Sequence, residues 1–194
     1  MIVLASQSAS RKAMLTSAGV DFVAIPAQLD ERMFEESLDT NEPEHIARAL
    51  AKAKALAIEP PDNGQLILGS DSLVTVDGQR FDKPTDRHSA ADHLRYFSGR
   101  QMKLHSAAAL VRHGSVIWSD CMTATLHVRD LSEPFIESYL DAEWPEVGYC
   151  VGVFRIEAMG VQLFERIEGD HFTVLGMPLL PVLAQLRQLG ELEQ

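Results

Sequence analysis

The chain has 194 residues, of which 17 are Lys or Arg and 28 are Asp or Glu, so its formal net charge is −11. Hydrophobic residues make up 46% of it, which excludes a mainly disordered chain and favours one domain or two small ones. The acidic balance disfavours nucleic acid and anionic membrane surfaces as partners. Residues 1–103 hold 12 basic and 15 acidic side chains, whereas residues 104–194 hold 5 basic and 13 acidic ones. If the protein binds a small anion, the basic side chains that hold it are therefore expected in the first part.

Two cysteines, Cys121 and Cys150, are too few for a disulfide framework or a four-ligand zinc site, which favours a reducing cytoplasm. The seven histidines are scattered and lack the spacing of helical metal ligands. No apolar run approaches the ~18 residues of a membrane span. The first residues, MIVLASQSASRK, lack the features of a signal peptide.

The first part alternates short strands with helices. Strands are expected at residues 2–5, 21–26, 65–69 and 73–76. Helices are expected from Ser8 to a stop at Gly19 and over residues 45–58, where Pro60-Pro61 would end the second one. The acidic stretch 28–44 is expected to be a loop or a short helix.

The second part has longer strands and two turn signals. Asp77-Gly78 and His113-Gly114 predict hairpins. The remaining expected elements are helices at 87–97, 132–140 and 178–189 and strands at 103–112, 116–128 and 147–156. Interleaved strands and helices with hairpins predict an α/β fold with a mixed, twisted sheet and flanking helices.

Residues 4–15, LASQSASRKAML, run from a strand into a helix start. A helix N-terminus with Ser6 and Ser8 in front of it offers donors to a phosphate, and Arg11 could grip two phosphate oxygens. Cations in the first turn oppose the helix dipole, so an anion explains them better than helix stability does. The alternative is that Ser8 is a simple N-cap and Arg11 a solvated residue.

Lys54 lies in the helix HIARALAKAKALA at the border of an apolar face formed by Ile46, Leu50, Ala53 and Ala57. A lysine in such a place either extends to water or points into a pocket. Asp71 lies where one apolar strand ends and another begins, which suits a general base, a metal ligand or a simple turn.

Two further candidates come later in the chain. Lys83 stands beside Pro84, which stiffens the backbone there. Glu157 lies between apolar residues in a glycine-rich stretch, so its carboxylate either accepts hydrogen bonds from a ligand or pairs with Arg155 or Arg166.

The order of these segments resembles the Maf family of nucleoside triphosphate pyrophosphatases. The matching segments are LASQSASR at 4–11, Asp30-Glu31, Lys54-Ala55, Gly69-Ser70-Asp71, Lys83-Pro84, Ser98-Gly99 and Gly176-Met177-Pro178-Leu179. The resemblance spans nearly the whole chain. It implies one domain over residues 1–194 with an inosine-triphosphatase-like fold and a cleft between two lobes.

The resemblance also implies an activity and the residues that carry it. The activity is hydrolysis of a nucleotide between its α and β phosphates, with a divalent metal such as Mg²⁺ or Mn²⁺. Ser6, Arg11, Lys54 and Lys83 would hold the triphosphate and Asp71 would accept the proton. Glu31, together with Asp71, would contact the metal. A homodimer is implied as well.

The resemblance also limits which nucleobase the substrate is expected to carry. The branch that acts on thymidine and uridine triphosphates has glutamine where Glu157 stands. A carboxylate only accepts hydrogen bonds, so it suits the adjacent N–H donors of a guanine-like base. The 7-methyl-GTP branch shares this region but has Trp at the position of Ser10 and Gln at that of Ser72, and an indole would stack on the charged base. The expected role is removal of a non-standard nucleotide; the alternative is a nucleotide-binding regulator of cell division with little catalysis.

Overall fold

The computed structural model of the chain describes residues 1–59 and 64–193. The described residues form two compact units. Unit 1 is drawn from Met1–Ser72, His105–Met122 and Asp170–Gln194, and unit 2 from Leu73–Leu104 and Thr123–Gly169. Pro60 and Pro61, which were expected to end a helix, lie outside the described residues.

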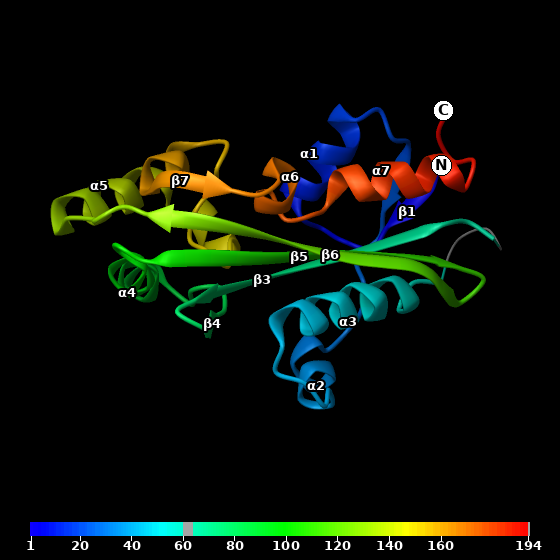
Figure 1. Cartoon of the computed structure of the whole chain (residues 1–194), viewed down its shortest axis with the longest axis horizontal. Helices are drawn as coiled ribbons and strands as arrows, with labels where there is room; N and C mark the ends of the chain where they lie inside the picture. Colours follow the sequence, from blue (N-terminus) through cyan, green and yellow to red (C-terminus); the bar gives the residue numbers. More distant parts are fainter. Residues whose placement is uncertain (60–63, 194) are drawn as a thin grey trace. The chain divides into compact units, whose positions relative to one another are not determined.

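The described residues contribute strands to one seven-stranded sheet (Figure 1). The strands are β1 (Ile2–Leu4), β2 (Phe22–Ala24), β3 (Ile67–Val76), β4 (Gln79–Phe81), β5 (Gln101–Arg112), β6 (Ser115–Val128) and β7 (Phe164–Glu168). Their order is β2-β1-β3-β5-β6-β7, with β4 paired to β3. Strand β1 runs parallel to β2 and β3, whereas β3–β4 and β6–β7 are antiparallel. The predicted mixed α/β sheet is therefore confirmed.

Helices connect these strands. They are α1 (Ala9–Ser17), α2 (Glu31–Glu36), α3 (Pro43–Leu56), α4 (Arg87–Phe97), α5 (Glu133–Glu143), α6 (His171–Val174) and α7 (Leu179–Gln188), with 3₁₀ turns η1 (Glu146–Tyr149) and η2 (Met159–Leu163). Ser8, Asp30, Asp86, Ser132 and Asp170 are N-caps that accept from a backbone N–H in the first turn. Within the described residues, no helix has the length and apolar character needed to cross a membrane.

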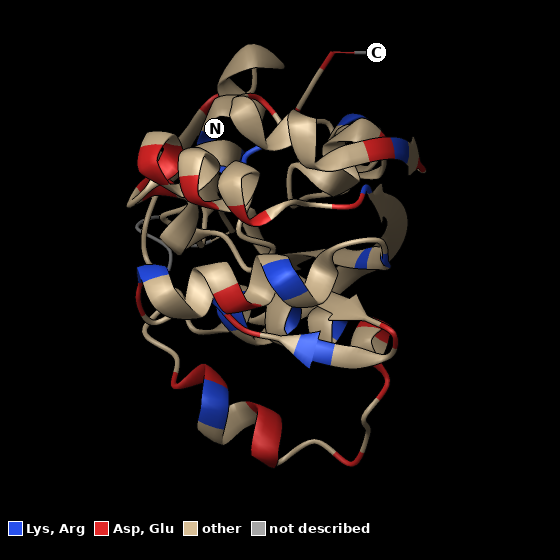
Figure 2. Cartoon of the chain, turned by 90° about the vertical axis from the view of Figure 1, so that its left-hand side faces the viewer, with Lys and Arg blue, Asp and Glu red and all other residues tan. Residues whose placement is uncertain are grey.

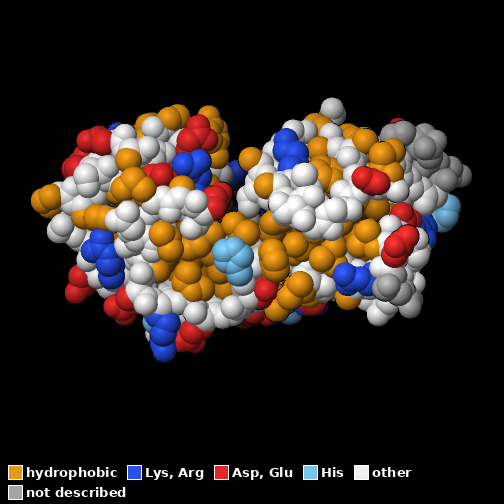
Figure 3. Space-filling view, turned by 90° about the horizontal axis from the view of Figure 1, so that it is seen from above, with side chains coloured by type: hydrophobic (Ala, Val, Ile, Leu, Met, Phe, Trp, Pro, Cys, Tyr) orange, Lys and Arg blue, Asp and Glu red, His pale blue; other side chains and the backbone are white. Residues whose placement is uncertain are grey.

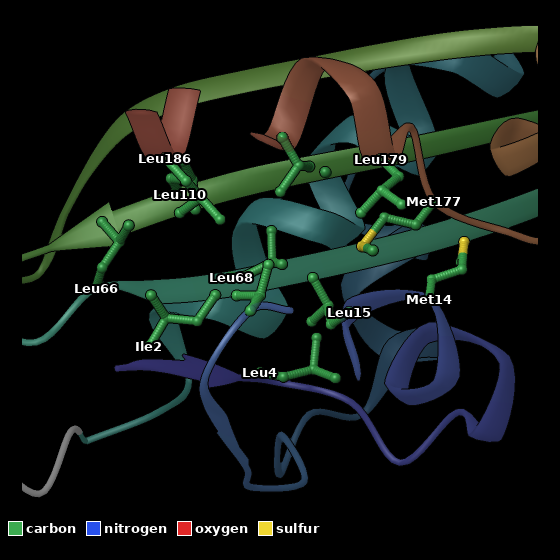
Figure 4. Packing of buried hydrophobic residues seen from close by; sticks show 13 residues of the cluster. Ile2, Leu4, Met14, Leu15, Leu66, Leu68, Leu110, Met177, Leu179 and Leu186 are labelled. Carbon is green, nitrogen blue, oxygen red and sulfur yellow. The ribbon is translucent and has the colours of Figure 1, made fainter. Parts of the chain in front are cut away.

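Strand β1 of unit 1 is buried on both faces, to which its alternate residues point. On one side, Ile2 and Leu4 of β1 pack with Leu15 of α1 and with Leu179 and Leu186 of α7 (Figure 4). On the other side, Val3 of the same strand packs with Ala55 of α3 and with Ile58, which follows that helix. The site residues described below therefore extend from a sheet that is packed on both faces.

The two predicted hairpin turns are present. Asp77 and Gly78 have φ of 51° and 78°, and His113 and Gly114 have φ of 51° and 68°. Positive φ at both central residues matches the right-handed twist of the flanking strands. Asp77-Gly78 therefore joins β3 to β4, and His113-Gly114 joins the long strands β5 and β6.

Two strand predictions are wrong. Residues 65–69 and 73–76 were expected as separate strands, but β3 runs without a break from Ile67 to Val76. Asp71 is consequently inside a strand and not at a strand end. The strand continues through the polar sequence Gly69-Ser70-Asp71-Ser72, because side chains and carbonyls of other elements form hydrogen bonds with its polar side chains.

The strand expected at 147–156 is replaced by the 3₁₀ turn η1 and an irregular loop. Val153 has φ of 54°, a conformation foreign to a strand and costly for a β-branched residue. It is buried, and its carbonyl accepts from the buried hydroxyl of Tyr139 at 3.0 Å. The carboxylate of Glu143 also holds this loop, because it accepts from Arg155 Nε at 2.9 Å and from the backbone N–H of Met159 at 3.3 Å.

Charged side chains of both signs occur on the same helices (Figure 2). In unit 2, Arg87 of α4 contacts Glu137 of α5 at 2.9 Å and Arg95 contacts Glu133 at 3.0 Å. These pairs are exposed, so each contributes little to stability. Acidic and basic residues thus alternate along helices of the chain.

The buried face of α3 is rotated from the one expected. Its buried residues are Ala47, Leu50, Ala51, Lys54 and Ala55. Ile46 and Ala53 are half-buried and Ala57 is exposed. The reason is the contact with Gly69 of β3, which allows the backbone of α3 to approach so closely that a Cβ on Gly69 would lie 2.1 Å from the carbonyl oxygen of Ala51.

Candidate active site

The first group of site residues lies where β1 leads into α1, within unit 1. Ser6 is buried and follows the strand directly, and its hydroxyl accepts from the backbone N–H of Ser8 at 3.2 Å. Ser8 is the N-cap of α1, as in the alternative interpretation, and accepts from the N–H of Arg11. The first turn of a helix has N–H groups without intrahelical acceptors. This segment therefore presents serine hydroxyls and backbone donors together.

The Arg11 guanidinium is held in place by three neutral acceptors. Its Nε donates to the carbonyl of Gly176 at 3.0 Å, Nη1 to Ser6 Oγ at 3.4 Å and Nη2 to Ser72 Oγ at 3.1 Å. Burial lowers the pKa of this guanidinium, while the nearby charges of Asp71 and Glu31 act in the opposite direction. Arg11 is thus a directed side chain and not the solvated residue of the alternative interpretation.

Lys54 forms the second group with two carboxylates of unit 1. Its Nζ lies 2.5 Å from Asp71 Oδ1 on β3 and 3.0 Å from Glu31 Oε2 at the start of α2. The side chains of Lys54 and Asp71 are about a tenth exposed, at 11% and 9%, whereas that of Glu31 is 51% exposed. Lys54 therefore points into the protein toward Asp71 and does not extend along the surface to water.

The Asp71 carboxyl has an altered acidity. Burial raises its pKa above the ordinary value, and the positive charges of Lys54 and Arg11 oppose this shift without cancelling it. A buried carboxylate with a raised pKa is a stronger base than an ordinary aspartate. It is the kind of group that takes up protons at active sites.

The carboxylates of Glu31 and Asp71 are suitable ligands for a hard divalent cation. They lie close together, since an oxygen of each contacts the ammonium group of Lys54. Mg²⁺ is commonly held by one or two carboxylates together with phosphates and waters. Within residues 1–59 and 64–193, no group of three or more His, Cys, Asp or Glu side chains could hold a metal ion.

The hydroxyls of Ser10 and Ser72 are engaged by the backbone that follows α6. Ser10 Oγ donates to the carbonyl of Leu175 at 2.7 Å, and Ser72 Oγ to that of Gly176 at 2.9 Å. These serines were predicted to influence the choice of base. The structure places them against the chain itself, next to Arg11.

Lys83 and Glu157 belong to unit 2, where both are exposed. Burial raises the pKa of the Cys150 thiol to about 11, and the charge of Glu157 adds to this shift while Lys83 counteracts it. The two side chains therefore share one neighbourhood in unit 2. Arg155 and Arg166, the alternative partners of Glu157, pair instead with Glu143 and Glu168.

Replacing Lys54 with Met should lower the free energy of unfolding by about 3 kcal/mol at pH 8, because the buried Asp71 carboxylate loses its main partner. Without Lys54 the pKa of Asp71 rises further above 3.8, the value ordinary for the unfolded chain. The folded state then binds a proton that the unfolded state has released, so stability falls as pH rises through the raised pKa. Urea unfolding should show a smaller penalty at pH 5 than at pH 8.

Lys52→Met is the matched control, since Lys52 lies on the same helix and is half-buried. It should change the free energy of unfolding by less than about 0.5 kcal/mol at both pH values. An equal penalty for Lys54→Met at pH 5 and pH 8 would contradict the pairing with Asp71.

Sequence reasoning missed the function of two small residues in this site. Gly69 lets α3 bring Lys54 to Asp71, and the carbonyl of Gly176 accepts from Arg11. Gly176 has φ of 102°, and a glycine directly after a short helix was the available signal for a left-handed turn there.

Comparisons with known proteins identify the family of this chain. The pattern of the Maf-like proteins matches residues 1–189. A nucleoside triphosphate pyrophosphatase of Nitrobacter hamburgensis is 45% identical over 189 residues, which are 97% of this chain and 94% of that protein. A 7-methyl-GTP pyrophosphatase of Rhizobium meliloti is 42% identical over 195 residues, covering 100% of this chain and 98% of the relative.

The chain also resembles solved structures. The Ham1 protein of Staphylococcus aureus has a TM-score of 0.45 and 13% sequence identity, over 95% of this chain and 97% of that one. The assignment rests on the sequence matches, which extend over nearly the whole chain at more than 40% identity. The chain belongs to the family of Maf-like proteins.

Proposed function

We propose that this protein hydrolyses a nucleoside triphosphate between its α and β phosphates, giving a nucleoside monophosphate and pyrophosphate. The observation that carries the proposal is the buried pair of Lys54 and Asp71, with Glu31 on the same ammonium group and Arg11 in electrostatic range. The names of the relatives that are 42–45% identical point in the same direction. The cellular role would be removal of a non-standard nucleotide.

The phosphates would be bound by groups that already face the same region of unit 1. Arg11 keeps unused N–H donors beyond its three internal hydrogen bonds, and the α1 N-terminus adds backbone donors. Lys54 contributes its positive charge, and Lys83 is proposed as a further phosphate ligand. Guanidinium and ammonium groups stabilise the charge that develops as pyrophosphate leaves.

Asp71 would act as the general base. A water molecule attacks the α-phosphorus, and its proton passes to the Asp71 carboxylate as the bond from the α-phosphorus to the bridging oxygen breaks. Lys54 orients the carboxylate through the 2.5 Å contact. The raised pKa of Asp71 improves its proton affinity for this step.

A divalent cation is part of the proposal. The positive charges of Arg11 and Lys54 are balanced by the negative charges of Asp71 and Glu31, whereas a triphosphate carries about four negative charges near neutral pH. Glu31 and Asp71 would hold the ion. When bound, such an ion neutralises phosphate charge and polarises phosphoryl oxygens.

The base would be guanine-like. Glu157 is exposed, and none of the described residues forms an ion pair with it, so its carboxylate is available as an acceptor for adjacent N–H donors. Ser10 and Ser72 offer no ring that could stack on a charged, methylated base. We therefore expect GTP or a related purine nucleotide to be preferred over UTP and dTTP.

A cytoplasmic homodimer is also proposed. Both cysteines are free thiols, as a reducing compartment would keep them. Hydrophobic side chains reach the surface on the face seen in Figure 3. Large exposed ones include Val161 and Ile167 in unit 2 and Leu180 in unit 1, and such residues are common in subunit interfaces.

The deciding experiment incubates the purified protein with GTP, 7-methyl-GTP, CTP, UTP and dTTP and identifies the products by chromatography. We expect monophosphate and pyrophosphate, with a guanine nucleotide cleaved best. Removal of divalent ions with EDTA should abolish turnover, and Mg²⁺ or Mn²⁺ should restore it. Release of phosphate without pyrophosphate would contradict the cleavage position, and nucleotide binding without products would favour a regulatory protein.

A further inference from the structure

The end of α6 and the backbone that follows it are tied to three other elements of unit 1 by serine hydroxyls. Ser10 of α1 donates to the carbonyl of Leu175, and Ser106 of β5 donates to that of Thr173 at 2.8 Å. Ser72 joins β3 to the same network, because its hydroxyl donates to the carbonyl of Gly176. These bonds hold residues 173–176 in one defined position against the start of α1.

The carbonyl of Gly176 is the centre of this network. It accepts from Arg11 Nε at 3.0 Å, from Ser72 Oγ at 2.9 Å and from Ser70 Oγ at 3.3 Å. Gly176 has φ of 102°, which side-chain-bearing residues rarely adopt. A Cβ at this position would also lie 3.3 Å from Ser72 Oγ. Only glycine therefore presents this carbonyl to Arg11 without strain.

The chemistry of the acceptors distinguishes Arg11 from Lys54. Lys54 is paired with two carboxylates, whereas the acceptors of Arg11 among the described residues are one carbonyl and two hydroxyls. Neutral acceptors fix the plane of a guanidinium and leave its positive charge available for an anion. Three of its five N–H groups are engaged, so the remaining two have a fixed direction.

We infer that Gly176 and Ser72 are positioning residues that orient Arg11 for binding the phosphates of the substrate. This inference rests on the proposed function and specifies how one of its phosphate-binding groups is prepared. A flexible arginine loses side-chain freedom when it binds, and a pre-oriented one has lost that freedom already. Loss of the orientation should therefore weaken binding more than it slows the chemical step.

The test compares Gly176→Ala with Gly190→Ala. Gly190 also has a positive φ, 74°, but nothing lies within 4 Å of a Cβ placed on it. The two variants share the backbone strain, and only the first disturbs the acceptor of Arg11. We expect Gly176→Ala to raise KM about tenfold with a smaller change in kcat, and Gly190→Ala to leave both near wild type.

A second comparison shows whether the effect passes through Arg11. In an Arg11→Ala background, Gly176→Ala should raise KM no further, although its cost in thermal stability persists. Ser72→Ala should raise KM in the same way, and Ser72→Thr, which keeps the hydroxyl, should restore it. Two results would overturn the inference. One is a KM of the double variant in which the effects of Gly176→Ala and Arg11→Ala multiply, and the other is an equal KM for the two glycine variants.

Calorimetric titration with inorganic triphosphate and Mg²⁺ separates this inference from the proposed function. If the wild-type protein binds triphosphate but forms no nucleoside monophosphate, the proposed reaction is wrong. The positioning role is then decided by the binding constants of the same variants. An affinity for triphosphate that is unchanged in both Arg11→Ala and Gly176→Ala would overturn the positioning role alone.

Discussion

Asp71→Asn should lower kcat by about 10²- to 10⁴-fold while the protein stays folded and continues to bind nucleotide. An amide has nearly the shape of the carboxylate but cannot accept the proton of the attacking water. Lys54 remains compensated in this variant, because Glu31 lies 3.0 Å from its Nζ. The fold should therefore tolerate the change, in contrast to removal of Lys54.

The measurement is pyrophosphate release at saturating nucleotide, with the melting temperature of the same preparation. Asp120→Asn is the matched control, because Asp120 is also in unit 1 and contacts a cation, Arg48, at 3.9 Å. It should keep kcat within about twofold of wild type. A kcat of Asp71→Asn close to that of wild type would remove Asp71 from the role of general base.

Gly69→Ala should have the largest effect on stability. A Cβ at this position would lie 2.1 Å from the carbonyl oxygen of Ala51, 2.8 Å from the backbone nitrogen of Ala55 and 2.9 Å from its Cβ. Helix α3 would have to move away from β3, at a cost of about 3 kcal/mol or more. Because α3 carries Lys54, the movement should also separate Lys54 from Asp71 and lower kcat.

Thermal unfolding measures this prediction, and about 3 kcal/mol corresponds to a loss of roughly 10 °C. The control is Gly19→Ala, where φ is 68° but nothing lies within 4 Å of the new Cβ, so the cost should be about 1 kcal/mol. Adding Ala55→Gly to Gly69→Ala should not restore stability, because the shortest contact is to the backbone of Ala51. Full recovery in the double variant would show that the side chain of Ala55 was the obstacle.

The sequence was sufficient for the order and type of most elements. Turn dipeptides such as Asp77-Gly78 require φ values that few residues adopt, so they locate hairpins by themselves. The serine before α1 is an N-cap in the structure for the same local reason. The order of short segments along the chain was also enough to recognise the family that the comparisons then identified.

Two predictions failed where local pattern and long-range packing disagree. The polar stretch around Ser70, between two apolar runs, suggested a break in a strand that is continuous. The apolar spacing in α3 suggested a face through Ile46 and Ala57, whereas the close approach to Gly69 buries Ala47, Ala51 and Ala55. Periodicity reports average exposure on one element and contains no information on the neighbour that packs against it.

The sequence by itself thus determined the family, the α/β class and the candidate residues one at a time. Only the tertiary structure decided how those in unit 1 are joined: Lys54 to Asp71 across 17 positions, and Arg11 to the carbonyl of Gly176 across 165. Such pairs depend on which strands are neighbours in the sheet and on which face of it each helix packs. These relations arise from burial and hydrogen bonding of the whole chain, and no local pattern of residues encodes them.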